Sequence, residues 1–197
     1  YIDFDDSKCF HRIMIDNTDN AEAKEVVQRY IDDDGTLMAE LAKHHGAPIG
    51  NVKMWFHAFS NGKQIKNWRK EEKITKTPHS YIHEFVEAQN AMTQELADKY
   101  PGAVAFIKEH DHRPPKRRLD DDNTVVYVEK TPELTFKSYF CQQEEAKSRE
   151  IKEGICTAHG FTLGPPMHDG MAVAEMKEPE QLAEQMTKAV SEQVCPM

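Results

Sequence analysis

The sequence predicts an α+β protein whose first part, residues 1–110, is a ferredoxin-like βαββαβ unit. Three observations support this prediction: short apolar runs typical of strands, longer segments with apolar residues at helical spacing, and an Asn61-Gly62 pair where the fold requires a hairpin. A charged connector is expected at 111–123. A second, shorter unit of strand, helix, strand and helix is expected at 124–197.

The first unit takes its predicted strands from short apolar runs. Two longer segments, 21–45 and 77–100, carry apolar residues at intervals of three and four and predict helices. The aspartates at 32–34, followed by Gly35, either divide the first of these segments into two helices or bend a single one. The expected strands are 9–15, 52–59, 64–68 and 103–107.

The second unit has clearer local signals. Residues 124–128 and 171–176 are apolar runs that predict strands. Thr131 and Pro132 match the preferences of an N-cap and a first helical turn, so a helix is expected from there to about residue 158. A last helix begins at Pro179, because apolar residues then recur every four positions: Leu182, Met186, Val190 and Val194.

A local similarity between the two halves suggests an internal duplication. His45-Gly46 and His159-Gly160 each follow a long helical segment, and a second glycine follows each pair four residues after its first glycine. Such a duplication would pack two sheets as in dimeric α/β-barrel proteins. The alternative is that both pairs are independent helix ends, where His and Gly are favoured anyway.

The composition of the chain argues against several classes of function. The chain of 197 residues has a formal net charge of −9, which makes it an improbable nucleic-acid binder because it would approach phosphates against its own field. Apolar residues make up 39%, and no apolar run approaches the length of a membrane span. Four widely spaced cysteines are expected to be free thiols, which favours an intracellular, reducing compartment such as the cytoplasm or an organelle matrix or stroma.

Three residues are candidates for catalysis. His168 lies between a rigid Pro165-Pro166 pair and Gly170, and a histidine held in this way could act as a general base. His57 and Tyr127 are candidates for proton transfer or substrate orientation. The alternative is that all three are structural, since no recognised nucleophile or phosphate-binding motif accompanies them.

Four histidines are candidates for a transition-metal site. His79 and His83 are four positions apart at a predicted helix start, the spacing of a two-histidine half-site. His110 and His112 would share one side of an extended segment. The alternative is that these are solvated polar residues, and no cofactor is indicated more strongly than a metal.

Two basic segments stand out in this acidic chain and could bind other protein subunits. One falls in the predicted hairpin region and the other in the charged connector, where either could contact an acidic neighbour. Their central residues are Lys66, Arg69 and Lys70, and Lys116, Arg117 and Arg118.

These observations favour a non-catalytic accessory or structural subunit of a larger assembly that docks through its charged segments. The alternative is a small α+β-barrel enzyme, or a protein that binds a metal or a small ligand in a histidine-containing pocket. A homodimer is compatible with either hypothesis, because a sheet with an uncovered face favours association.

Overall fold

The computed structural model describes residues 2–5, 8–111, 116–119, 125–128, 131–166, 170–174 and 179–193. Within these ranges the chain is predominantly helical, so the ferredoxin-like α+β prediction is wrong. The elements are β1 (Ile2–Asp5), α1 (Cys9–Asp16), α2 (Ala21–Ile31), α3 (Thr36–His45), α4 (Ile49–Ser60), α5 (Ile65–Glu71), α6 (Ser80–Lys99), α7 (Pro101–His110), β2 (Lys116–Leu119), β3 (Val125–Val128), α8 (Pro132–Ala158), β4 (Thr162–Pro166), β5 (Gly170–Ala174) and α9 (Pro179–Gln193).

All four strands predicted in the first half are helices. Residues 9–15 lie in α1, 52–59 in α4, 65–68 in α5 after the N-cap residue Gln64, and 103–107 in α7. The physical reason is clearest in α4, because its buried residues recur at intervals of three and four, while Met54 between them is 65% exposed. The buried residues of α4 are Val52, Trp55, Phe56 and Phe59.

The predicted hairpin at Asn61-Gly62 is the end of α4. The backbone N–H of Asn61 donates to the carbonyl groups of His57 and Ala58, and Gly62 follows with φ +83°. A Cβ on Gly62 would collide with the side chain of Leu134 on α8. An Asn-Gly pair supplies the left-handed backbone that a hairpin needs, and the same preference serves a helix end that packs closely against another helix.

The proposed duplication is also wrong. Gly46 and Gly160 do adopt positive φ, at +67° and +73°, where α3 and α8 end. However, α3 is followed by helix α4, whereas α8 is followed by strand β4. The similarity between the halves is therefore a similarity of two helix ends, and the described part contains no pair of related sheets of the α/β-barrel kind.

Several helices lie where the sequence predicts them. The aspartates at 32–34 and Gly35 separate two helices, α2 and α3. The Thr131 side chain caps α8 by accepting a hydrogen bond from the N–H of Leu134, at 3.3 Å. In α9, Leu182, Met186 and Val190 are buried as their spacing predicts, and Val194 lies outside the described residues. The strands β3 and β5 overlap the segments predicted as strands in the second half.

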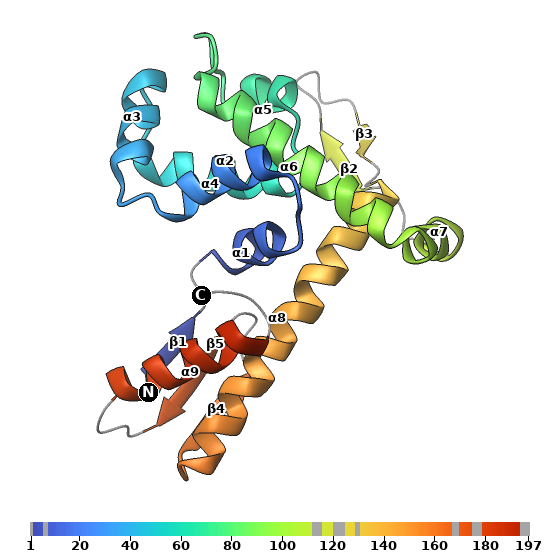
Figure 1. Ribbon diagram of the computed structural model, residues 1–197. Helices are drawn as coiled ribbons and strands as arrows, with labels where there is room; N and C mark the ends of the chain where they lie inside the picture. The colour runs from blue at the N-terminus through green and yellow to red at the C-terminus, as the bar shows by residue number, and fades with distance from the viewer. Residues whose placement is uncertain are drawn as a thin grey trace.

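Helix α6 lies at the centre of the helical part and contacts α2, α4, α7 and α8 (Figure 1). Its aromatic core is built around Phe85, whose ring meets Phe56 edge-on with centroids 4.7 Å apart. Tyr30 stacks on Phe56 at 4.9 Å and also meets Phe85 edge-on at 5.4 Å. Buried aromatic pairs of this kind add to the free energy of burial itself, so they fix α2, α4 and α6 relative to one another.

Helix α8 runs from the helical part to a small C-terminal sheet (Figure 1). The sheet has the order β1-β5-β4 with antiparallel neighbours, so the first strand of the chain pairs with β5, and Ile2 lies opposite Val173. Helix α9 packs on α8 through Met186 and Cys156. The domain boundaries at 110 and 124 remain a prediction.

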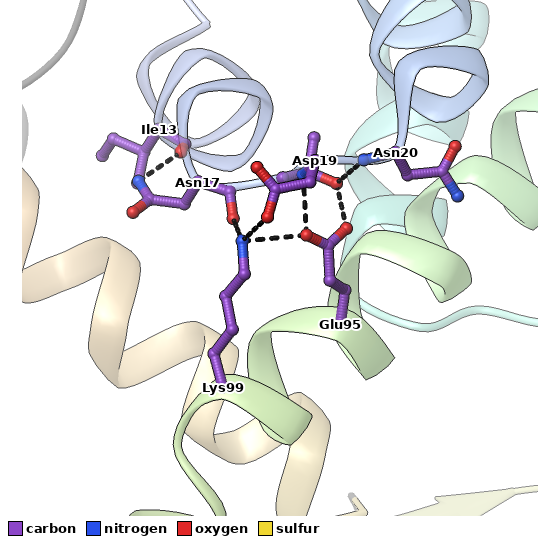
Figure 2. Close-up of polar contacts among 7 residues, drawn as sticks. Ile13, Asn17, Asp19, Asn20, Glu95 and Lys99 are labelled. Atoms are coloured by element: carbon purple, nitrogen blue, oxygen red, sulfur yellow. Dashed lines mark hydrogen bonds and ion pairs between the residues drawn. The ribbon is translucent and has the colours of Figure 1, made fainter.

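A polar clamp fixes the connector between α1 and α2 to the end of α6 (Figure 2). The carboxylate of Glu95 accepts hydrogen bonds from the backbone N–H of Asp19, at 2.6 Å, and from the hydroxyl of Thr18. Lys99 donates to the carbonyl of Asn17 at 2.8 Å and lies 2.8 Å from Glu95. The clamp thereby sets the position of α1, which forms one wall of the cavity described below.

The structure also bears on the expected free cysteines and on the expected absence of a membrane span. Cys9, Cys141 and Cys156 are buried free thiols, as predicted, and Cys195 lies outside the described residues. Within the described ranges, no helix combines the length and apolar character needed to cross a membrane.

Candidate functional site

A cavity of about 450 Å³ lies where α1, α4, α6 and α8 meet. Its rim includes the exposed residues His57, Asn61 and Gln142. Its inner wall combines apolar side chains with buried polar groups, a mixture typical of small-molecule sites. The polar groups and aromatic ring that define its chemistry are those of Lys8, His11, Tyr30, Ser60, Gln89 and Lys137.

Lys137 is the most unusual of these residues, because a lysine is rarely buried without a partner of opposite charge. Its side chain is only 5% exposed. Its Nζ donates to the carbonyl oxygen of Ser60 and to Oε1 of Gln89, both at 2.9 Å, and it forms no ion pair with any described residue. Burial lowers the pKa of Lys137 to about 8.

Gln89 is the second buried polar group with unused hydrogen-bonding capacity. The residue is 2% exposed, and its Oε1 is occupied by Lys137. Its Nε2 has no hydrogen-bond partner among the described residues. An unpaired buried amide N–H costs about 1–3 kcal/mol, and Gln89 is one of the residues that line the cavity.

His11 and Ser60 form a buried pair on the adjacent wall. His11 Nε2 lies 2.7 Å from Ser60 Oγ, and the Ser60 hydroxyl donates to the carbonyl of Phe56 at 2.9 Å. Because that hydroxyl has only one hydrogen, the imidazole Nε2–H is the donor of the pair. Burial, followed by the charges of Lys137 and Lys8, lowers the pKa of His11 to about 3, so the ring is neutral.

Lys8 occupies a strained position at the start of α1, with φ +57°. Its Nζ donates to the carbonyls of Tyr30 and Ile31, at 2.6 and 2.9 Å, and sits 4.7 Å from the centre of the Tyr30 ring. These contacts neutralise the negative end of α2. Burial lowers the pKa of Lys8 as well.

The apolar part of the wall consists of Phe10, Tyr30 and Leu134. The same cavity is also lined by Lys137, which carries an amine, and by Gln89, which carries an amide. Such a site can hold an organic molecule with an apolar body and an oxygen that accepts hydrogen bonds. Nothing in the geometry requires the ligand to be large, since cavities of this size enclose molecules of ordinary drug dimensions.

The structure places only one predicted catalytic residue at this cavity. His57 lies at the rim. His168 lies outside the described residues, and Tyr127 is in β3, where side chains are not described. A catalytic group of these three residues therefore remains a prediction.

The predicted metal ligands are not brought together in the described part of the chain. His79 caps α6, where its Nδ1 accepts the N–H of Tyr81 at 3.2 Å, while His83 lies on the exposed side of the same helix. His110 stacks on Phe106 at 4.2 Å. Among the described residues, no three His, Cys, Asp or Glu side chains form a group that could hold a metal ion, and His112 lies outside them.

One predicted docking group is brought together. Lys66, Arg69 and Lys70 on α5 line an open groove with Ile65 and Ile74, and His83 lies beside them. The second basic group, Lys116, Arg117 and Arg118, forms β2, whose side chains are not described.

Sequence reasoning missed Lys137, His11, Ser60 and Gln89. One signal was present for Lys137: it belongs to the buried face of α8, which carries polar residues at helical spacing. The intervals along this face are four, four, three, four and four residues, an arrangement expected of a core-facing stripe. Its members are Lys137, Cys141, Glu145, Ser148, Lys152 and Cys156.

Comparison of the chain with models of known protein families, and with curated protein sequences, finds no match. Its function therefore has to be inferred from the chemistry of the cavity and of the surface.

Proposed function

We propose that the protein binds a small organic molecule in the cavity between α1, α4, α6 and α8. One observation carries the proposal: Lys137 and Gln89 are buried side by side, and both have donor capacity that no described residue fills. Buried polar groups are normally paired, because each unpaired one lowers stability. A ligand oxygen that accepts from both residues would supply the missing partner.

The wall chemistry defines the ligand class. Phe10, Tyr30 and Leu134 offer apolar and aromatic surface to the body of the ligand. Its polar end would reach Lys137 and Gln89, so it carries a carbonyl or carboxylate oxygen. At the rim, Asn61 Nδ2 donates to the carbonyl of His57 at 2.9 Å, and the Asn61 Oδ1 could accept from a second polar group of the ligand.

The test is a thermal-shift screen of the purified protein against small aldehydes, ketones and carboxylates. We expect members of one class to raise the melting temperature in a saturable way. A Lys137→Met variant, which keeps the apolar stem but loses the amine, should lose this shift. The matched control is Lys188→Met, at an exposed position on α9. Equal shifts for both variants would contradict the proposal.

A second candidate function is docking of an acidic protein segment on α5. The supporting observation is that Lys66, Arg69 and Lys70 line one groove around the apolar side chains of Ile65 and Ile74, in a chain with a net charge of −9. Interfaces commonly combine an apolar centre with a charged rim in this way.

The docking candidate is tested by charge reversal. Lys66→Glu combined with Lys70→Glu should reduce co-purification of partner proteins at low salt, while the fold is retained. Lys53→Glu, at an exposed position on α4, is the control. Partner recovery that is unchanged by the double reversal would exclude α5 as the docking surface.

A further inference from the structure

We propose that Lys137 is a carbonyl-reactive lysine, whose Nζ forms an imine with an aldehyde or ketone bound in the cavity. This inference rests on the proposed small-molecule function and names the chemical class of the ligand. It also assigns a covalent step to a residue that would otherwise only donate hydrogen bonds.

The hydrogen bonds of Lys137 suit a neutral amine. A neutral –NH₂ group has two hydrogens and one lone pair, whereas an ammonium has three hydrogens. The two acceptors present, the Ser60 carbonyl and Gln89 Oε1, satisfy two hydrogens. No third hydrogen bond to Nζ is made within the described part of the chain, and in the neutral amine the position without a hydrogen carries the nucleophilic lone pair.

Burial of the amine increases the share of its neutral form, although the Cys141 charge acts in the opposite direction. The titratable groups of the packed elements are Lys8 and His11 from α1, Tyr30 from α2, His57 from α4, and Cys141 and Glu145 from α8; α6 contributes the neutral Gln89. Desolvation is the main cause that lowers the Lys137 pKa to about 8. About a tenth of the lysine is then the free amine at pH 7, against less than about a thousandth for an exposed lysine.

The reaction needs no oxidant or reductant. The Lys137 nitrogen lone pair forms a bond to the carbonyl carbon, and the π electrons of the C=O bond move to oxygen. A proton moves from nitrogen to that oxygen, which gives a carbinolamine. Loss of the hydroxyl group with the second nitrogen hydrogen releases one water and leaves the C=N bond.

A neighbouring side chain can support this step. The unpartnered Nε2–H of Gln89 can donate to the carbonyl oxygen as negative charge develops there. Cys9 lines the same cavity, whereas Cys141, four residues from Lys137 along α8, is not among the lining residues. Burial raises the pKa of the Cys141 thiol to about 12, so it stays protonated and unreactive.

The inference is tested by trapping. Purified protein is mixed with a panel of aliphatic and aromatic aldehydes, including butanal and benzaldehyde, and any imine is reduced with cyanoborohydride. Peptide mapping then compares labelling at Lys137 with labelling at the exposed Lys43 and Lys188. We expect Lys137 to be labelled at least about ten-fold faster at pH 7, with a rate that rises up to about pH 8 and then levels off.

Two variants sharpen the test. Gln89→Leu removes the donor to the carbonyl oxygen and should slow labelling of Lys137 several-fold without changing the labelling of Lys188. Ser138 lines the same cavity but forms no hydrogen bond with Lys137 or Gln89. The Ser138→Ala variant should therefore leave the labelling rates of Lys137 and Lys188 unchanged. Because the main comparison uses the unaltered protein, it does not depend on a variant that folds.

The outcomes distinguish failure of the imine inference from failure of the proposed ligand binding. If Lys137 is labelled no faster than Lys188 across the panel, the imine inference is overturned. If carboxylates of matching carbon skeleton, such as benzoate, then still raise the melting temperature in a Lys137-dependent way, the proposed ligand-binding function stands. If neither class binds or reacts at the cavity, both proposals fail.

Discussion

His11 Nε2 lies 2.7 Å from Ser60 Oγ and so joins α1 to the end of α4, across 49 residues of sequence. Ser60 is also bonded to α8, because its carbonyl oxygen accepts from Lys137. One residue at a helix C-terminus therefore holds two other helices through its hydroxyl and its carbonyl. The position of the Lys137 amine depends on this junction, so stability and ligand binding should be linked there.

Removal of the Ser60 hydroxyl should destabilise the protein. In Ser60→Ala, the buried His11 Nε2–H loses its acceptor, and a buried donor left unsatisfied costs about 1–3 kcal/mol. Chemical unfolding followed by the fluorescence of the buried Trp55 and Trp68 would measure the loss. Ser138→Ala, in which a partly exposed hydroxyl is removed, should change the free energy of unfolding by less than about 0.5 kcal/mol. A Ser60→Ala protein as stable as this control would contradict the role of the pair.

Stability should fall as the pH is lowered below about 6.5, because His11 is neutral in the folded protein. Its folded pKa of about 3 is below that of an unfolded histidine, so the unfolded chain binds the proton first. This linkage removes about 2 kcal/mol between pH 8 and pH 5. A His11→Gln variant keeps a side-chain N–H donor but cannot titrate, and its unfolding free energy should lose less over the same range. If the variant and the unaltered protein lost the same unfolding free energy between pH 8 and pH 5, His11 would have an ordinary pKa in the folded state.

Gly62 and Gly50 provide a matched pair of substitutions in and beside α4. Gly62→Ala should destabilise the protein by about 1 kcal/mol or more, because φ is +83° and the new methyl group would collide with Leu134 at the cavity wall. Gly50→Ala lies in the same helix with open space around its Cβ, and should be neutral or stabilising by up to about 1 kcal/mol. Thermal unfolding of both variants would check the contrast, and equal effects would contradict the close contact between Gly62 and α8.

Local chemistry predicted some elements of this fold well and failed for others. Thr131 and Pro132 specify a helix start by their own side chains, and α8 begins there. The segment 52–59 is ambiguous, because consecutive Trp55 and Phe56 before an Asn-Gly pair suit both a strand with a hairpin and a helix with a left-handed end. Packing of α4 against α6 decides between them, and the sequence alone does not reveal that packing.

Neither the fold class nor the centre of the candidate site was predicted correctly from the sequence. His57 was identified from the sequence, and it lies at the cavity rim. The central contact joins Lys137 to Ser60, 77 residues away, and to Gln89, 48 residues away. None of these residues belongs to a motif, and a lysine in a helix is normally solvated. Only the convergence of α4, α6 and α8 brings these three residues together, so a single sequence could not identify the site.

Glu95 should stabilise the protein through the clamp on the α1–α2 connector, and this contribution should disappear in acid. Although desolvation raises the pKa of Glu95, hydrogen bonds from Lys99, Thr18 and the Asp19 amide lower it to about 2 overall. A carboxylate with a lowered folded pKa stabilises the protein above its unfolded pKa, and the effect is lost as the pH falls toward the folded value. Glu95→Ala should therefore cost about 2 kcal/mol at pH 7, and its difference from the unaltered protein should shrink between pH 5 and pH 3. Glu87→Ala, at an exposed position on the same helix, is the control and should show little effect at either pH. Urea unfolding at each pH measures both variants, and a Glu95→Ala loss that is independent of pH would mean that packing, and not the ionised clamp, holds the connector.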